Sequence, residues 1–240
     1  HTGTIPSHNS SSTSVIDLSP TLQSQILGGE QHFAVYLPPS YAAEPNKRYP
    51  VLYLLHGMNQ NYKSWINEGA LQAVADEVIA EGAKEMIIIC PDGFNSFYYN
   101  RPQMRYEDFF IQEFIPEIER RYRILSEKSH RNIAGLSMGG FGATYLAFQY
   151  HNLFGNAYST SGGFIEPAMS LLKGIINAKL PTQKNFFPSY TLECGEEDSL
   201  VIESNRVFSQ FLDEKQINYT KIFRQGTHNW KFWKESLPKI

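Results

Sequence analysis

The chain has 240 residues, 42% of them hydrophobic, which is enough to form one sizeable core. Its net charge of −3 leaves no basic excess to neutralise phosphates, so the composition argues against a nucleic-acid partner. No apolar run approaches the roughly 18–20 residues that span a bilayer, which argues against a membrane protein.

The first 14 residues, HTGTIPSHNSSSTS, are polar and rich in Ser and Thr. This composition is typical of a flexible leader, and residues 15–240 are expected to form a single domain. The sequence shows no signal peptide, so it does not decide whether the protein is exported. We expect a secreted or extracellular protein, with a cytoplasmic one as the alternative.

The N-terminal half alternates strands with helices. An apolar run over 51–55 has no polar face, as expected of a central strand covered on both sides. In the second predicted helix, Pro116 must lie at a kink or in a first turn. The predicted elements are strands over 31–37, 51–55 and 85–90, and helices over 63–81 and 107–122.

The C-terminal half continues the alternation. It has predicted strands at 132–134, 156–160, 190–194 and 219–223, and helices at 141–150, 204–215 and 230–237. Residues 164–188 have weak periodicity and are expected to form a cap-like insertion. The alternation predicts an α/β fold with a mostly parallel central sheet and helices on both faces. The two cysteines, Cys90 and Cys194, end predicted strands and are expected to behave as small buried hydrophobes.

A G-x-S-x-G pattern at 135–139 places Ser137 between a predicted strand and a predicted helix. In a nucleophile elbow the serine occupies a sharp strained turn, and the positions two before and two after it approach too closely for side chains. Gly139, Gly140 and Gly142 would allow such packing. Ser137 is therefore the candidate nucleophile. The alternative is a glycine-rich turn with an unreactive serine.

A serine hydroxyl needs a base, and seven histidines compete for that role. His56 ends a central strand but precedes Ser137, whereas the chain order that accompanies this motif is serine, acid, histidine. His56 is therefore expected to shape the loop beside it. His228 follows the last predicted strand and is the candidate base, with an exposed loop histidine as the alternative.

The imidazole also needs an acid to hold one tautomer, and chain order restricts that acid to residues 138–227. The acidic loop 195–198 follows a predicted strand, and Asp198 is favoured there, with Glu197 in reserve. Glu166 in the irregular segment stays open, whereas the acids at 213–214 are typical of a solvated helix face. The alternative for the loop is a charged turn without a catalytic role.

A tetrahedral oxyanion needs hydrogen-bond donors, which are commonly backbone N–H groups. One donor is expected from Met138, the residue after the nucleophile. The second is expected from the loop after the strand that ends in His56-Gly57, at the Met58 N–H.

Together these blocks resemble the esterase D-like hydrolases of the α/β-hydrolase superfamily over roughly residues 25–240. The blocks are 49–57 with Trp65, 91–93 with 96–99, 135–140, Cys194-Gly195 with Asp198, and 226–228 with Trp230 and Trp233. The resemblance implies one α/β-hydrolase catalytic domain and a triad of Ser137, His228 and Asp198. It also implies Met58 and Met138 as oxyanion donors, and no metal or organic cofactor.

Within that group the chain is most similar to feruloyl and acetyl-xylan esterases of carbohydrate esterase family 1 and to tributyrin-type esterases. S-formylglutathione hydrolases typically have a different histidine block, and mycolyltransferases usually carry Asp at the position of His56. The resemblance implies hydrolysis of feruloyl or acetyl esters on plant cell-wall polysaccharide through an acyl-enzyme. The alternatives are a short-chain general carboxylesterase, an S-formylglutathione hydrolase-like enzyme, a peptidase and a non-catalytic carbohydrate-binding domain.

The partner expected is a small-molecule or polysaccharide ester, and the oligomeric state is left open. Aromatic side chains near the motifs are expected to line a pocket for a phenolic ring or a sugar. The candidates are Trp65, Phe97, Tyr98, Tyr99 and Trp230. The alternative is that several of them belong to the core.

Overall fold

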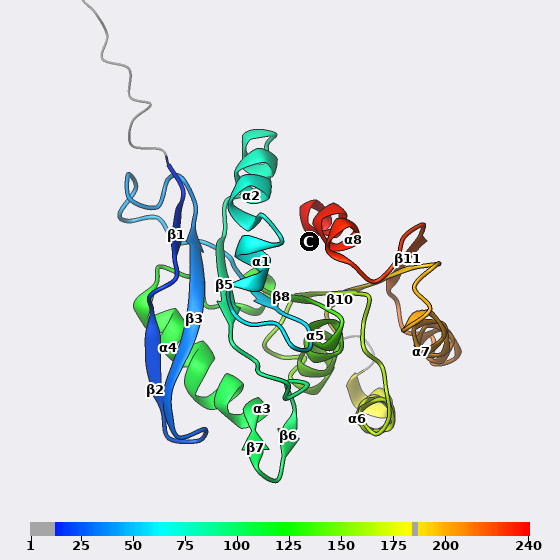
Figure 1. Cartoon of the computed structure of the whole chain (residues 1–240). Coiled ribbons are helices and arrows are strands. Elements are labelled where there is room, and N and C mark those ends of the chain that lie inside the picture. Colours follow the sequence, from blue (N-terminus) through cyan, green and yellow to red (C-terminus); the bar gives the residue numbers. More distant parts are fainter. Residues whose placement is uncertain (1–12, 184–186) are drawn as a thin grey trace, which may run out of the picture.

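The computed structural model describes residues 13–183 and 187–240, and it is built around one twisted sheet (Figure 1). Residues 1–12 of the expected leader lie outside this range. Ser14, at the end of that expected leader, is buried, and its hydroxyl donates to Asp76 Oδ2 at 2.8 Å. The chain is therefore fixed to the body of the molecule from residue 14 onward.

Within the described residues the main sheet has nine strands, in the order β1-β3-β5-β4-β8-β9-β10-β11, with β2 paired to β3. Six neighbouring strands from β5 to β11 run parallel, and β1, β2 and β3 pair antiparallel at one edge. The mostly parallel sheet of the prediction is confirmed. The strands are β1 Val15–Asp17, β2 Thr21–Ser24, β3 Gly29–Leu37, β4 Val51–Leu55, β5 Ile87–Pro91, β8 Arg131–Leu136, β9 Asn156–Thr160, β10 Ser189–Gly195 and β11 Thr220–Arg224, and a separate hairpin joins β6 Asn100–Arg101 to β7 Met104–Arg105.

Helices cover both faces of the sheet (Figure 1). They are α1 Ser64–Asn67, α2 Leu71–Ala80, α3 Tyr106–Asp108, α4 Ile115–Arg121, α5 Met138–Gln149, α6 Ala168–Gln183, α7 Ile202–Glu214 and α8 Trp230–Ser236, with a π-helical turn at Phe109–Phe114 and 3₁₀ turns at Lys128–His130 and Leu237–Lys239. Along β4 the side chains alternate between two cores: Tyr53 packs against Phe110 and Phe114 of the π-helical turn, whereas Leu52 and Leu54 belong to the core with α1, α2 and α8. This alternation is the period of two that a strand covered on both sides requires.

Two predicted helices are interrupted. The helix expected over 63–81 is two helices, because the chain turns sharply between them: Ala70 has φ +51°, and a Cβ at Gly69 would lie 2.3 Å from Trp65 O. The helix expected over 107–122 contains the π turn immediately before α4, and Pro116 lies in the first turn of α4. Since a proline ring clashes with the carbonyl four residues earlier, the wider π turn accommodates it.

The cap-like insertion expected over 164–188 is not a cap. Its main element is α6, whose residues Ala168, Met169, Leu172 and Ile176 are buried in the same core as α5. Helix α6 is thus part of the crossover between the parallel strands β9 and β10.

The register of the sheet aligns the carboxyl ends of five strands. Leu55 at the end of β4 pairs with Gly135 of β8, and Leu136 pairs with Thr160 at the end of β9. Gly195 at the end of β10 pairs with Arg224 at the end of β11. The loops after these strands therefore emerge at one edge, where α/β proteins commonly bind ligands.

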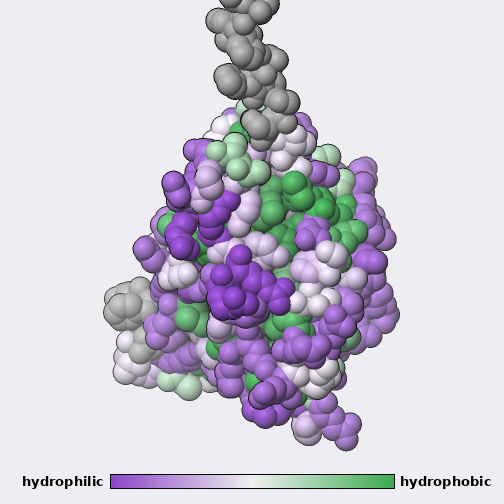
Figure 2. All heavy atoms as spheres, turned by 90° about the vertical axis from the view of Figure 1, so that its left-hand side faces the viewer, coloured by the Kyte–Doolittle hydropathy of each residue, from purple (hydrophilic) through white to green (hydrophobic). Residues whose placement is uncertain are grey.

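The face on the β1 side of the molecule is largely hydrophilic around one apolar patch (Figure 2). None of the described helices is both long enough and apolar enough to cross a bilayer. Cys90 and Cys194 are buried and unbonded, as the sequence predicts. Burial raises the pKa of the Cys194 thiol to about 12 and raises that of Cys90 further, which keeps both thiols protonated and unreactive.

Candidate active site

Ser137 stands at the turn between β8 and α5 with φ +54° and ψ −117°, a conformation that L-residues rarely adopt. The surrounding glycines make this turn possible. A Cβ at Gly135 would lie 2.2 Å from Gly139 O, and one at Gly139 would lie 2.4 Å from Leu55 O. The backbone of Ser137 is held on both sides, because its N–H donates to Thr160 O at 2.9 Å and its carbonyl accepts from Gly163 N–H at 2.8 Å.

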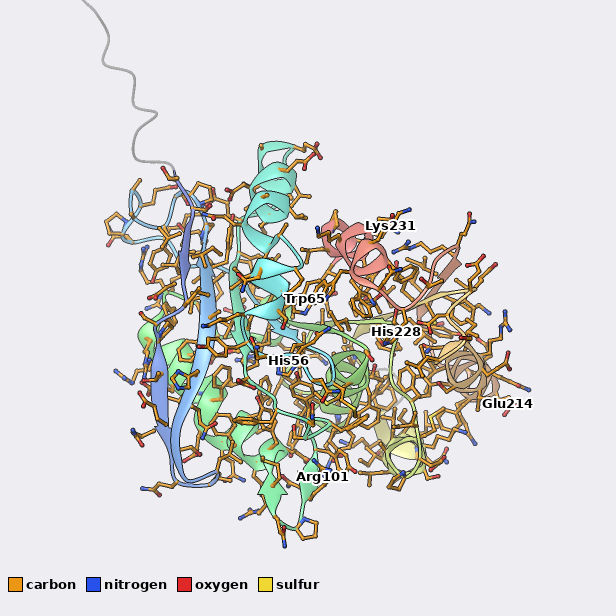
Figure 3. The ribbon with its side chains drawn as sticks, viewed as in Figure 1. His56, Trp65, Arg101, Glu214, His228 and Lys231 are labelled. Atoms are coloured by element: carbon orange, nitrogen blue, oxygen red, sulfur yellow. The ribbon has the colours of Figure 1, made fainter. Side chains whose placement is uncertain are left out.

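His228 lies in the loop between β11 and α8 (Figure 3), and both its ring nitrogens have partners. Nδ1 is 2.7 Å from Asp198 Oδ2, and Nε2 is 3.0 Å from Ser137 Oγ. Since an ionised carboxylate can only accept, the Nδ1 proton points to Asp198 and Nε2 is left to accept from the serine hydroxyl. The structure thus brings together the three residues that the sequence singled out.

Asp198 is 1% exposed and fully occupied by partners. Its other oxygen, Oδ1, accepts from the backbone N–H groups of Leu200 at 3.1 Å and Val201 at 3.3 Å. These bonds orient the carboxylate at the start of α7 and leave Oδ2 for the imidazole. The rival acids lie elsewhere: Glu197 Oε2 accepts from Gly226 N–H at 2.7 Å, and Glu166 Oε2 accepts from the Ser170 hydroxyl at 2.7 Å.

The other rival histidine, His56, is part of the scaffold. Its Nε2 accepts from Gly93 N–H at 2.8 Å, which places the ring proton on Nδ1, where Gly57 O accepts it at 2.7 Å. The Asp92 carboxylate is 3.5 Å from Nε2, but the N–H of Gly93 is the closer partner. His56 therefore joins the loops after β4 and β5, in agreement with its expected role.

Trp233 of α8 forms a wall behind the imidazole. Its ring centroid is 5.0 Å from that of His228, and the two planes are nearly perpendicular at 85°. The indole N–H donates to Ser161 Oγ at 2.9 Å, and Ser161 is itself buried with φ +52°. The sequence showed Trp233 only as part of a family block and did not mark it as a site residue. Its spacing of five residues after His228 was the available signal.

A cavity of about 410 Å³ opens over Ser137 and His228. The loop after β4 contributes 57–60 to its wall, and no Asp, Glu, Lys or Arg of the described residues lines it. The Leu200 side chain at its mouth is 72% exposed. The apolar lining residues with bulky side chains are Met58, Phe97, Leu136, Met138, Ile165, Leu200, Val201 and Trp233.

Both expected oxyanion donors border this cavity. Met138 begins α5, so its N–H is one of the unpaired donors at the helix N-terminus. The Met58 N–H makes no hydrogen bond to another residue in the described ranges. An anion above Ser137 would thus meet two backbone N–H groups and the favourable end of the α5 dipole.

Of the five aromatic residues expected to bind substrate, only Phe97 lines the cavity. The expectation is wrong for Trp65 and Tyr98, which are 1% and 0% exposed. Trp65 Nε1 donates to Leu55 O at 3.0 Å, and the Tyr98 hydroxyl donates to His56 O at 2.8 Å, so each binds the scaffold. Tyr99 packs on Phe141, and Trp230 packs between Trp65 and Trp233, outside the cavity lining.

Within the described residues, no group of three His, Cys, Asp or Glu side chains is placed so that it could hold a metal ion. The arrangement that is present suits acyl transfer. It holds a hydroxyl, an imidazole and a carboxylate in series, with backbone donors beside the hydroxyl.

The comparisons of the sequence and of the structure with known proteins agree on one family. The family model named Esterase matches residues 24–240. A ferulic acid esterase of known structure superposes with a TM-score of 0.83 at 31% identity, over 95% of this chain and 96% of that one. The chain thus has the α/β-hydrolase fold that the sequence resemblance implied.

Two curated relatives match a shorter segment. Esterase Rv1288 of Mycobacterium tuberculosis is 34% identical over 148 residues, which cover 58% of this chain and 31% of the relative. The endo-1,4-beta-xylanase/feruloyl esterase of Xylanibacter ruminicola is 33% identical over 156 residues, covering 61% of this chain and 22% of the relative. The match therefore spans less than a third of the length of either relative.

Proposed function

This chain belongs to the Esterase family, and we propose that it hydrolyses carboxylic esters through an acyl-enzyme on Ser137. Residues 15–240 would act as a single catalytic domain. The observation that carries the proposal is the hydrogen-bonded series in which His228 Nε2 is 3.0 Å from Ser137 Oγ and Nδ1 is 2.7 Å from Asp198 Oδ2. Such a series activates a hydroxyl that is a poor nucleophile on its own.

In the first half-reaction, Ser137 Oγ attacks the ester carbonyl carbon while its proton passes to His228 Nε2. The carbonyl oxygen becomes an oxyanion and accepts from the N–H groups of Met58 and Met138. Asp198 stabilises the imidazolium. When the C–O bond to the alcohol breaks, His228 returns the proton to the leaving oxygen. Water then repeats the sequence on the acyl-enzyme and releases the acid and free Ser137.

We propose a feruloyl or acetyl ester of plant cell-wall polysaccharide as the substrate. The ferulic acid esterase that is 31% identical over nearly its whole length supports this, as does the relative that combines xylanase with feruloyl esterase. The apolar cavity wall with Phe97 and Trp233 suits an aromatic or short aliphatic acyl group. Because such a polysaccharide lies outside the cell, we also propose that the protein works there.

Ser137→Ala tests the proposed reaction, with Ser170→Ala on the exposed side of α6 as the matched control. The native protein and Ser170→Ala should cleave p-nitrophenyl acetate and should be labelled by a fluorophosphonate probe. Ser137→Ala should do neither and should keep its melting temperature. Turnover by Ser137→Ala at the native rate would refute the assignment.

A substrate panel separates the alternatives. Methyl ferulate and acetylated xylan should be cleaved with a higher kcat/KM than p-nitrophenyl butyrate if the substrate class is right. A preference for the butyrate would indicate a short-chain general carboxylesterase, and a preference for S-formylglutathione would indicate a thioester hydrolase. Cleavage of peptide anilides would indicate a peptidase. No turnover and no labelling of the native protein would favour a binding domain.

A further inference from the structure

The loop after β4 binds the backbone N–H groups on either side of Met58 to other residues and, within the described residues, leaves the Met58 N–H unbonded. Gly57 N–H donates to the side-chain oxygen of Gln60 at 2.9 Å, and Asn59 N–H donates to Asn95 Oδ1 at 2.8 Å. Gln60 N–H closes a turn onto Gly57 O at 3.2 Å. Between these bonded groups, the Met58 N–H has no partner among the described residues and borders the cavity.

The peptide unit that carries the Met58 N–H also carries the Gly57 carbonyl. That carbonyl is held from behind by His56 Nδ1 at 2.7 Å and by Gln60 N–H at 3.2 Å. In a planar trans peptide the N–H points opposite to the C=O. Fixing the carbonyl on the scaffold side therefore aims the Met58 N–H away from the scaffold.

The peptide units on either side are fixed by side-chain amides. Gln60 Oε1 holds the unit before, through Gly57 N–H, and Asn95 Oδ1 holds the unit after, through Asn59 N–H. Because φ and ψ of Gly57 and Met58 are the only soft angles between these units, few orientations of the Met58 N–H remain. A Cβ at Gly57 would lie 2.7 Å from the Leu136 side chain, so the turn also packs directly against the nucleophile elbow.

The amide pair of Asn59 and Asn95 is reciprocal and exposed. Asn95 Nδ2 returns a hydrogen bond to Asn59 Oδ1 at 3.0 Å, and Asn59 holds a left-handed φ of +63°. Arg101 (Figure 3) binds the Asn95 carbonyl at 2.8 Å and supports the loop after β5 from the other side. Exposed hydrogen bonds of this kind add little to folding stability, because water satisfies the same groups in the unfolded chain. The effect of these hydrogen bonds is to fix the geometry of the loop.

We propose that Gln60 and Asn95 are positioning residues that aim the Met58 N–H at the developing oxyanion. This inference rests on the proposed ester hydrolysis and on Met58 as a donor. It predicts that both side chains act on the transition state and leave substrate binding in the ground state nearly unchanged.

The test uses variants of matched size that lack the acceptor oxygen, Gln60→Met and Asn95→Leu, in the full chain. Each should lower kcat for p-nitrophenyl acetate by about 10- to 100-fold, because loss of a single oxyanion donor typically costs about 10²–10³-fold. KM and the melting temperature should stay near the native values. The inhibition constant of phenylboronic acid, which forms a tetrahedral serine adduct, should rise by about the same factor as kcat falls.

Two further variants control the experiment. Asn95→Asp keeps the acceptor for Asn59 N–H and should retain most of kcat. Gln103→Ala removes an exposed amide from the turn between β6 and β7, outside the cavity lining, and should retain all of it. Because Gln60 and Asn95 lie on separate loops, either variant carries the test if the other fails to fold.

Native kcat in Gln60→Met and Asn95→Leu would overturn the inference. So would a loss of kcat that follows a loss of melting temperature, or one matched by an equal rise in KM. Failure of the proposed function is a different result: Ser137→Ala would then turn over at the native rate, whatever these two variants do.

Discussion

His228 Nε2 lies 3.0 Å from Ser137 Oγ although the two residues are 91 positions apart in the sequence. The parallel sheet brings them together, because β8 and β11 end at the same edge. A hydrogen bond between residues so far apart depends on the register of several strands.

Asp198→Asn tests the acid of the proposed triad. The amide keeps an oxygen for the N–H groups of Leu200 and Val201 but can donate toward His228, which favours the wrong imidazole tautomer. We expect kcat for p-nitrophenyl acetate to fall by roughly 10³–10⁴-fold while the melting temperature changes little.

Glu197→Gln is the matched control, since Glu197 is adjacent and its carboxylate binds Gly226 N–H and not the imidazole. Its kcat should remain within about threefold of native, as expected for a substitution outside the reacting series. Equal losses in the two variants would contradict the assignment of Asp198.

Trp233→Phe should loosen the wall behind His228. Phenylalanine keeps an aromatic ring there but leaves the buried Ser161 hydroxyl without its indole donor. We expect about 1–3 kcal/mol less unfolding free energy in urea, the usual cost of a buried unsatisfied polar group, and a lower kcat. Trp230→Phe is the control, because its indole N–H has no hydrogen-bond partner in the described part of the chain. A larger loss in Trp230→Phe would contradict this account.

Glu193 is a buried carboxylate that ties α8 to the sheet. It is 0% exposed and accepts from Tyr158, Thr160 and Ser236, and it pairs with Arg224 at 3.1 Å. Glu193→Gln removes one of the two carboxylates that pair with Arg224, the other being Glu235 at 2.8 Å, and weakens a buried hydrogen-bond network, so it should lower the unfolding free energy by about 1–3 kcal/mol, measured in urea.

The exposed Glu196 on the following loop gives the control for Glu193. Glu196→Gln should change the unfolding free energy by less than about 0.5 kcal/mol. If Glu193→Gln were as mild, the carboxylate would not be what holds α8.

Glu117 gives a stability that depends on pH. The pKa of Glu117 is lowered from 4.5 to about 2. The largest cause is the hydrogen bond from Arg120, and pairing with Arg121 lowers the pKa further. A lowered pKa in the folded state means that the stabilisation is complete above about pH 5 and is lost as pH falls toward 2. Because the Glu117 side chain is 25% exposed, we expect only about 0.5–1 kcal/mol.

Comparing the urea unfolding of Glu117→Gln with the native chain at pH 7 and pH 3 checks this. The difference in unfolding free energy should shrink at pH 3 and in 1 M salt, where the pair is screened. A difference that is equal at both pH values would exclude the ion cluster as its source.

The sequence was informative where one local pattern determines the structure. The strands at 51–55 and 156–160 were predicted with their observed bounds, the first because an unbroken apolar run between turn signals has few alternatives. The elbow was predictable because its glycines are adjacent in sequence to Ser137. The catalytic roles of Ser137, His228 and Asp198 remain predictions, although the distances among them are now known.

Which aromatic side chains are buried and which line the cavity could not be predicted from the sequence. Tyr98 and Phe97 are neighbours in one loop, and both have positive φ, yet one is buried and the other lines the cavity. Tyr98 turns inward because Gly93 and Gly142 leave room for its ring: a Cβ on either would lie 2.2–2.4 Å from it. Gly93 and Gly142 are far from each other in sequence, so their shared role is visible only in three dimensions. The strands β6 and β7 have no signal for a different reason: at two residues each, they are too short to show a periodic pattern.

Because Gly139 packs directly against Leu55 O, the nucleophile elbow and the end of β4 should move as one rigid body. Heat or pressure that displaces β4 would carry the serine and the Met58 loop in the same direction, so their relative geometry should survive distortions that shift both within the molecule. Any side chain at position 139 would separate the two bodies. A protein engineered for heat tolerance must therefore keep glycine at position 139, whatever is changed elsewhere.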